Sequence, residues 1–146
     1  SMPRSANFRK GVRSWAFAGS DPARGGLGPA FAVPVALRRS GGIPFERMRF
    51  FELDEPSAAE AIACLRALAS RAFCERHFSS GPVGSFDPKR VNVNGGTIAL
   101  GRPLGASGIR LVLSLARELE RTAGDLGIAA AGAAGGQGGA VILERA

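Results

Sequence analysis

The sequence predicts one α/β domain, on the basis of its length and its pattern of apolar residues. At 146 residues the chain is long enough to bury a single hydrophobic core, and chains of this length typically form one domain. Apolar runs typical of strands alternate along it with runs typical of helices. Alternation of this kind favours a sheet covered by helices. We therefore expect one domain over residues 1–146, with residues 1–11 flexible.

The first half of the chain is expected to begin with a strand, a loop, a helix and a second strand. Val12–Ala18 alternates weakly and predicts a strand, and the Gly and Pro cluster over Gly19–Pro29 predicts a loop. Phe31–Ser40 predicts a short helix, in which Pro34 is compatible only with the first turn because proline lacks the backbone N–H. Met48–Leu53 predicts the second strand.

A second helix is expected to start at Pro56, since proline suits the first position of a helix. Asp54 or Glu55 would then cap it. Its buried face is expected to carry apolar residues at helical spacing, namely Ala58, Ile62, Leu65 and Ala69.

Residues 72–90 show no helical or strand period, so they are interpreted as a long polar loop. Loops of this length are either functional or mobile. We favour a mobile loop.

The second half is expected to contain three strands and one long helix. Val91–Val93 predicts a strand, and Ile128–Ala134 and Ala140–Glu144 predict a hairpin. The helix is expected over Ala106–Thr122, and residues Ile109–Ala116 are apolar on nearly every face of it. A helix of this kind needs cover on both sides.

The charge and the composition exclude few functions. A net charge of +7 is compatible with nucleic acid as a partner, but the basic residues are scattered, so we do not expect nucleic-acid binding. No run approaches the ~20 apolar residues of a membrane span. The basic start, with Arg4 and Arg9, is compatible with an organellar presequence. We expect the cytoplasm, with an organellar matrix as the alternative.

Cysteine and histidine usage points to a reducing compartment without a metal site. Cys64 falls on the apolar face of a predicted helix, where a buried thiol behaves as a small hydrophobe. Cys74 is the second cysteine, and His77 is the single histidine. No CxxC or HxxxH spacing occurs, so no metal is expected.

Four segments closely resemble the C-terminal half of the thiolases, the acetyl-CoA acetyltransferases and 3-ketoacyl-CoA thiolases. NVNGGTIALGRPLGASG at Asn92–Gly108 is nearly identical to the family's NVNGGAIALGHPLGASG. Gly127–Gly139 resembles the segment that carries CIGGGQG, and ELDEPSAA at Glu52–Ala59 resembles that with NEAFAA. Arg13–Pro29 looks like the first strand and loop of the same half. The resemblance implies a five-stranded mixed sheet with helices on both faces.

The resemblance also implies that the catalytic residues of the family are replaced. The family's catalytic His is Arg102 here, and its catalytic Cys is Gly132. The family's Asn, which orients a water in an oxyanion hole, is Asp54. An arginine stays protonated and cannot accept the proton of a nucleophile. A glycine has no acid or base, and a carboxylate would repel a developing enolate.

Other family positions are expected to line a pocket or a close backbone approach. Ser57 stands where the family's Phe lines the acyl pocket. The remaining pocket or loop positions are glycines, namely Gly95, Gly96, Gly101, Gly105, Gly135 and Gly136. Gly101, Gly105 and Gly108 precede a helix, which leaves a phosphate site as an alternative, but we favour close backbone packing.

These features predict a thiolase-like domain without a working thiolase site, acting as a binding or assembly module related to acyl-CoA metabolism. The alternative is half of an acyl-CoA acyltransferase whose N-terminal half is supplied by a longer precursor or a second chain. We expect no cofactor, and an acyl-CoA thioester is a candidate ligand. Because the two thiolase halves share a topology, we expect a homodimer, with a thiolase N-terminal half as the other candidate partner.

Overall fold

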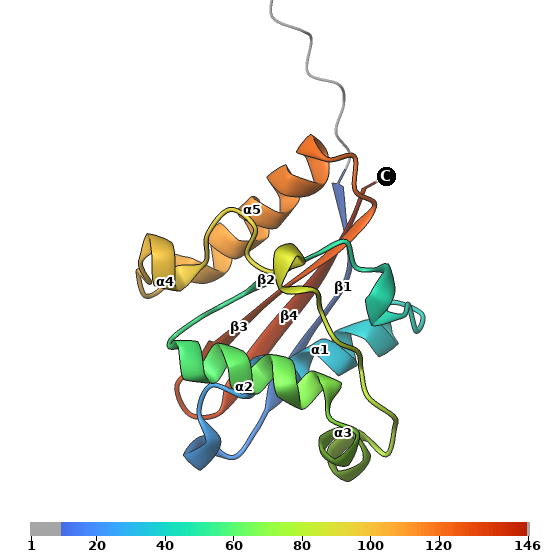
Figure 1. Cartoon of the computed structure of the whole chain (residues 1–146), viewed down its shortest axis with the longest axis vertical. Helices are drawn as coiled ribbons and strands as arrows, with labels where there is room; N and C mark the ends of the chain where they lie inside the picture. Colours follow the sequence, from blue (N-terminus) through green and yellow to red (C-terminus); the bar gives the residue numbers. More distant parts are fainter. Residues whose placement is uncertain (1–9, 146) are drawn as a thin grey trace, which may run out of the picture.

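A four-stranded sheet with helices on both faces forms the core of the computed structural model, which describes residues 10–145 (Figure 1). The elements follow in chain order as β1 (Lys10–Gly19), α1 (Gly28–Arg39), β2 (Phe50–Leu53), α2 (Ala58–Ala69), α3 (Arg71–Phe78), α4 (Thr97–Leu100), α5 (Ser107–Arg121), β3 (Leu126–Ala133) and β4 (Gln137–Arg145). Three short 3₁₀ turns lie at Pro22–Arg24, Phe45–Arg47 and Pro88–Arg90.

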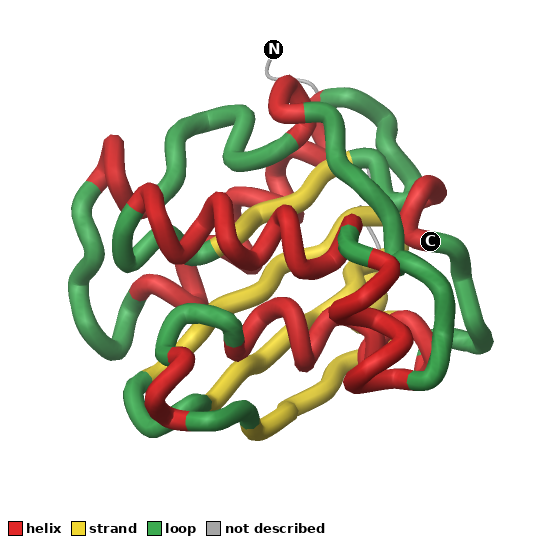
Figure 2. The backbone as a smooth tube through the Cα atoms, turned by 60° about the horizontal axis from the view of Figure 1, so that its bottom comes forward, coloured by secondary structure: helices red, strands yellow, loops and turns green. Residues whose placement is uncertain are grey.

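The strands lie in the order β1-β4-β3-β2. β4 pairs antiparallel with both β1 and β3, whereas β2 pairs parallel with β3, so the sheet is mixed. Figure 2 shows the strands of this sheet running side by side, with helices in front of them. The carboxyl end of β2 therefore lies beside β3, and this places Asp54 next to the strand that contains Gly132.

The two faces of the sheet are covered to different extents. One face packs on α1 and α2 around a core that includes Val33, Phe51 and Ile142, all at 0% exposure. The other face packs on α5 through Leu111, Leu115 and Leu119. α5 contacts β2, β3 and β4, whereas the β1 side chains that point to this face, Trp15 and Phe17, are exposed.

The predicted fifth strand at Val91–Val93 is wrong, because only Val91 forms a single parallel bridge, to Phe51. Asn92 takes a left-handed backbone conformation with φ 48°, which ends any extension of the ladder. Its side-chain amide replaces the missing strand contacts, since Asn92 Oδ1 accepts from Leu53 N at 2.8 Å and Nδ2 donates to Leu53 O at 2.9 Å.

The expected loop at 72–90 is partly wrong, because Arg71–Phe78 form helix α3. Ser70 caps the helix by accepting a hydrogen bond from Phe73 N at 3.2 Å. Phe73 packs edge-on against Phe31 of α1 with ring centroids 5.3 Å apart. A helix of two turns is too short to show a clear period in the sequence. Short helices depend on tertiary packing for their stability, and the contact of Phe73 with Phe31 supplies such packing here.

Helix α1 is longer than predicted and contains Pro34 in its interior. Pro29 occupies the first turn in its place. An interior proline removes a helical hydrogen bond and costs about 3 kcal/mol. Burial of Val33 and Pro34 against the sheet offsets this cost, which periodicity and propensity cannot show.

The expected cap and buried face of the second helix are also corrected. α2 begins at Ala58, and its cap is Ser57 in place of Asp54 or Glu55. Its buried residues are Ala61, Cys64, Ala67 and Leu68, whereas Ile62 is 49% exposed. Apolar residues lie on two faces of α2. The face that contains Cys64 is the buried one, because α2 packs against α1.

Other predictions agree with the structure within a few residues. The first strand, the helix over Ala106–Thr122 and the hairpin are confirmed, with β4 starting three residues earlier at Gln137. Residues 1–11 were expected to be flexible. Of these, residues 1–9 lie outside the described part of the chain, and Lys10 and Gly11 belong to β1. Both cysteines are free and buried. Within residues 10–145 no helix has the length and apolar character needed to cross a membrane.

Ser57→Ala is expected to lower the free energy of unfolding by about 1 kcal/mol, because the variant loses the N-cap of α2. Ser57 Oγ accepts from Glu60 N at 3.2 Å and donates to Glu60 Oε2 at 2.9 Å. Urea unfolding followed by circular dichroism measures the change. Ser57→Asp, which keeps a capping oxygen, should retain the wild-type stability; equal losses in both variants would contradict this role.

Candidate functional site

The three positions at which the resemblance implies replaced catalytic residues come together in the structure. Asp54 follows β2, Arg102 lies between α4 and α5, and Gly132 lies in β3. Arg102 Nη2 donates to Asp54 Oδ2 at 2.8 Å and to the Gly132 carbonyl at 3.2 Å. Arg102 Nε lies 3.2 Å from the same Asp54 oxygen. A two-pronged ion pair therefore occupies the centre of the site.

This ion pair is mostly removed from water. The Asp54 side chain is 1% exposed and that of Arg102 is 31% exposed. Thr97 Oγ donates a further hydrogen bond to Asp54 Oδ1 at 3.2 Å. The hydrogen bond with Asp54 raises the pKa of Arg102 above its already high ordinary value, and burial opposes only part of this shift. Arg102 therefore stays protonated and cannot act as a general base.

The backbone around the ion pair is held to β2 by several hydrogen bonds. Asp54 N donates to Ala130 O at 2.9 Å and continues the parallel pairing of β2 with β3. Thr97 Oγ accepts from Glu55 N at 2.6 Å, and Glu55 Oε2 accepts from Ile98 N at 3.2 Å. These contacts fix α4 against the end of β2. The loop that carries Arg102 therefore starts from a defined position.

The glycines beside Arg102 are required by backbone conformation, which corrects the expectation of close packing. Gly101 and Gly105 have φ angles of 87° and 85°, in the region that favours glycine. A Cβ placed at either of them, or at Gly108, would meet no atom within 4 Å. Arg110 Nη1 donates to Gly101 O at 2.8 Å and fixes the turn that presents Arg102.

The other predicted pocket positions lie in turns or at helix caps. Gly95 has φ 90° in the turn before α4, and Gly96 is the N-cap residue of that helix. Gly135 and Gly136, with φ 81° and 75°, form the turn between β3 and β4. Ser57 is exposed and caps α2.

Gly132 has room for a side chain. Its nearest neighbour to a hypothetical Cβ is Pro29 Cδ at 3.4 Å, which is an ordinary van der Waals contact. Nothing in the surrounding packing therefore requires glycine at this position. The packing would therefore also accept a residue with a side chain at position 132.

Glu52 is a buried carboxyl group that the sequence analysis did not select. It is 1% exposed on β2, and its Oε1 has no hydrogen-bond partner within the described part of the chain. Burial, with the nearby carboxylates of Glu118 and Glu55, raises its pKa to about 7, although Arg110 opposes the shift. The signal in the sequence is the acidic residue inside the otherwise apolar strand Phe50–Leu53.

Glu118 anchors a second polar contact beside Glu52. It is 3% exposed, and its side chain accepts hydrogen bonds from Arg121 at 2.7 Å and from Asn94 at 2.9 Å. These contacts, led by the Arg121 hydrogen bond, lower the pKa of Glu118. Asn94 thus connects the loop before α4 to the outer turn of α5.

Comparison with known proteins gives consistent matches over most of the chain. Residues 7–145 match the family model described as thiolase, C-terminal domain. A 3-ketoacyl-CoA thiolase of Shewanella amazonensis is 39% identical over 135 residues, which cover 91% of this chain and 31% of the relative. Another from Shewanella sp. (strain W3-18-1) is 38% identical over the same length.

Solved structures give the same result. Human mitochondrial 3-ketoacyl-CoA thiolase superposes with a TM-score of 0.75 at 34% identity, covering 92% of this chain and 30% of the human chain. The human enzyme in complex with CoA superposes with a TM-score of 0.74, covering 91% and 29%. The chain therefore spans about a third of the length of the relatives it matches.

Proposed function

The chain belongs to the thiolase family as its C-terminal domain, and we propose that it works by binding and assembly and not by thiolase catalysis. The observation that supports this proposal is the ion pair of Arg102 and Asp54 at 2.8 Å, because the resemblance assigns catalytic or oxyanion-binding roles to these two positions. The substituted positions contact one another instead of facing a substrate.

Each missing group corresponds to a step that this chain cannot perform. A protonated Arg102 cannot take the proton of a nucleophile. Gly132 offers no acid or base for the second substrate. Asp54 is engaged with Arg102 and presents a carboxylate where an oxyanion hole needs a donor. Each loss by itself lowers a rate by roughly 10² to 10⁴, so the combination leaves no thiolase mechanism.

The alternative is half of an acyl-CoA acyltransferase that needs an N-terminal thiolase half from a longer precursor or a second chain. The span of 31% of a relative's length supports this alternative. A CoA complex of a similar enzyme supports an acyl-CoA as ligand. In this alternative Arg102 would contact an anion, but the structure engages its guanidinium with Asp54 and Gly132.

For the assembly role, we propose either a second copy of the chain or a thiolase N-terminal half as the partner. Large apolar side chains on α5 and β1 are exposed and could contact such a partner, including Ile109 at 66% and Phe17 at 77%. We place this role in acyl-CoA and lipid metabolism, in the cytoplasm or in an organellar matrix.

The isolated chain is expected to show no thiolysis of acetoacetyl-CoA above background. The assay measures acetyl-CoA formation, with the intact Shewanella amazonensis enzyme as the positive control. A turnover within about a thousandfold of an ordinary enzyme, whose kcat is about 1–10³ s⁻¹, would contradict the proposal.

Adding the separately expressed N-terminal half of the Shewanella enzyme distinguishes the two functions. We expect the wild-type chain to stay inactive in this mixture, because Arg102 and Gly132 still lack the required groups. Activity of the wild-type mixture would support the acyltransferase alternative. Arg102→His/Gly132→Cys by itself should also be inactive, since the family's acylated nucleophile belongs to the other half.

A further inference from the structure

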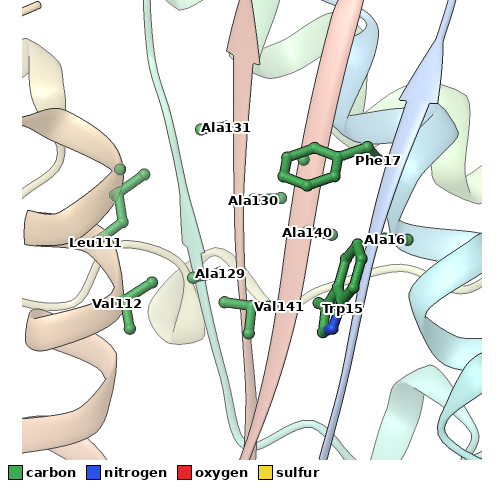
Figure 3. Close-up of a pocket in the computed structure, with 12 residues that line it drawn as sticks. Trp15, Ala16, Phe17, Leu111, Val112, Ala129, Ala130, Ala131, Ala140 and Val141 are labelled. Atoms are coloured by element: carbon green, nitrogen blue, oxygen red, sulfur yellow. The ribbon is translucent and has the colours of Figure 1, made fainter. Parts of the chain in front are cut away.

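An apolar groove runs along the less covered half of the sheet, between α5 and β1 (Figure 3). Its volume is about 400 Å³. In Figure 3, Leu111 and Val112 of α5 form one wall, and Trp15 and Phe17 of β1 form the other. The floor consists of small and apolar residues of β3 and β4, namely Ala129, Ala130, Ala131, Gly139, Ala140 and Val141. Among the described residues 10–145, no charged side chain lines this groove.

An adjacent face of α5 forms an apolar ridge next to the groove. Ile109 and Leu113 are four residues apart, so they lie on one face of the helix. They are 66% and 52% exposed. Leu111 and Leu115 of the same helix face the sheet and are buried. The ridge therefore points away from the chain's own core.

We infer that the groove binds the α5 ridge of a second copy, in a two-fold dimer in which each copy supplies one ridge and one groove. A two-fold pairing requires both complementary surfaces on the same chain. The chain meets this condition, because the wall of the groove and the ridge are adjacent sides of α5. The small residues at Ala129, Ala131 and Gly139 leave space above the sheet for a neighbouring helix.

The exposed apolar area reaches the lower limit for a specific pair. Aromatic side chains cover roughly 150–250 Å² each, so Trp15 at 55% and Phe17 at 77% exposure present about 250 Å² together. Ile109, Leu113 and the groove floor add a comparable area. Two copies would therefore bury about 1,000 Å², which is the lower limit for a specific interface. A patch of this extent is seldom left uncovered on a monomer.

The chemistry of the groove favours a protein surface over a charged ligand. Phosphates of a CoA or a nucleotide need cationic side chains or N–H donors, and the lining residues supply no charged group. Beside the ridge, Arg110 and Arg117 line the same surface hollow as Ile109 and Leu113. The dimer rests on the assembly part of the proposed function and is independent of the loss of catalysis.

Sedimentation of the wild-type chain at about 10–100 µM, a concentration range suited to an interface of this size, should give twice the 15.0 kDa mass of one chain. Leu113→Glu and Phe17→Lys should each weaken the dimer at least about 100-fold, since each places a charge in a desolvated contact. Ile62→Glu is the matched control, because Ile62 is 49% exposed on α2, away from the groove. This control should remain dimeric.

A mixture of Leu113→Glu and Phe17→Lys chains tests the pairing directly. A heterodimer of these two chains has one unaltered ridge and groove contact and one Glu–Lys pair, so the mixture should recover dimer that neither variant forms by itself. The recovery also shows that both variants fold.

Several results would overturn the inference. These are a monomeric wild type at these concentrations, a dimer insensitive to Leu113→Glu, or a mixture that stays monomeric. A wild type that is monomeric alone and binds the N-terminal half of a thiolase would assign the groove to that half instead. An inactive monomer would contradict only the dimer, whereas an active dimer would contradict only the loss of catalysis.

Discussion

Arg102→Ala is expected to lower the free energy of unfolding by about 3 kcal/mol, because it leaves Asp54 as a buried carboxylate without its cation. Asp54 is 1% exposed and would keep only the Thr97 hydroxyl as a side-chain donor. Breaking a buried pair costs about 3–5 kcal/mol. We expect the lower end because Arg102 is 31% exposed, which lets water reach part of the site. Urea unfolding at a fixed protein concentration measures the change.

A double-mutant cycle separates the ion pair from simple loss of packing. Asp54→Ala/Arg102→Ala should be more stable than Arg102→Ala, because it removes the buried charge together with its partner. Arg71→Ala is the surface control, since its pair with Glu75 at 3.2 Å joins side chains that are 72% and 56% exposed. This control should change stability by about 0.5 kcal/mol or less. An Arg102→Ala variant as stable as the control would refute the structural role.

Stability should decrease by about 3 kcal/mol between about pH 4.5 and pH 7 because of Glu52. Burial, followed by Glu118 and Glu55, raises its pKa in the folded state from 4.5 to about 7. In this window the folded state holds a proton that the unfolded state has released, so raising the pH favours unfolding. Each pKa unit corresponds to about 1.4 kcal/mol, which gives the stated magnitude. The full contribution of protonated Glu52 is present below about pH 4.5.

Glu52→Gln should remove most of this dependence, because a neutral amide does not titrate. Urea unfolding at pH 5 and pH 8 compares the wild type with this variant. Glu118 acts in a different range: its pKa is lowered, chiefly by the hydrogen bond with Arg121, so its contribution is lost only as the pH falls below the ordinary carboxyl range. Equal pH dependence in the wild type and Glu52→Gln would show that other groups cause it.

The local elements with strong sequence signals were predicted well. α5 and the β3–β4 hairpin are long enough for periodicity and turn residues to define them, and both are confirmed. The eight-residue α3 was missed, because contacts of Phe73 with a distant helix stabilise it. The predicted fifth strand is absent from the described residues, because the side chain of Asn92 makes the hydrogen bonds to Leu53 that a strand backbone would have made.

The sequence by itself determined the family and the identity of the residues at Asp54, Arg102 and Gly132, because these depend on motif letters and on the chemistry of each residue type. The tertiary structure decided that Arg102 and Asp54 form a buried ion pair that reaches the Gly132 carbonyl. It also decided that Glu52 is buried without a partner for Oε1. Such contacts depend on which strand ends and loops lie side by side. Periodicity describes only neighbours within one element, so segments 30 to 48 residues apart meet only through the order of the strands in the sheet.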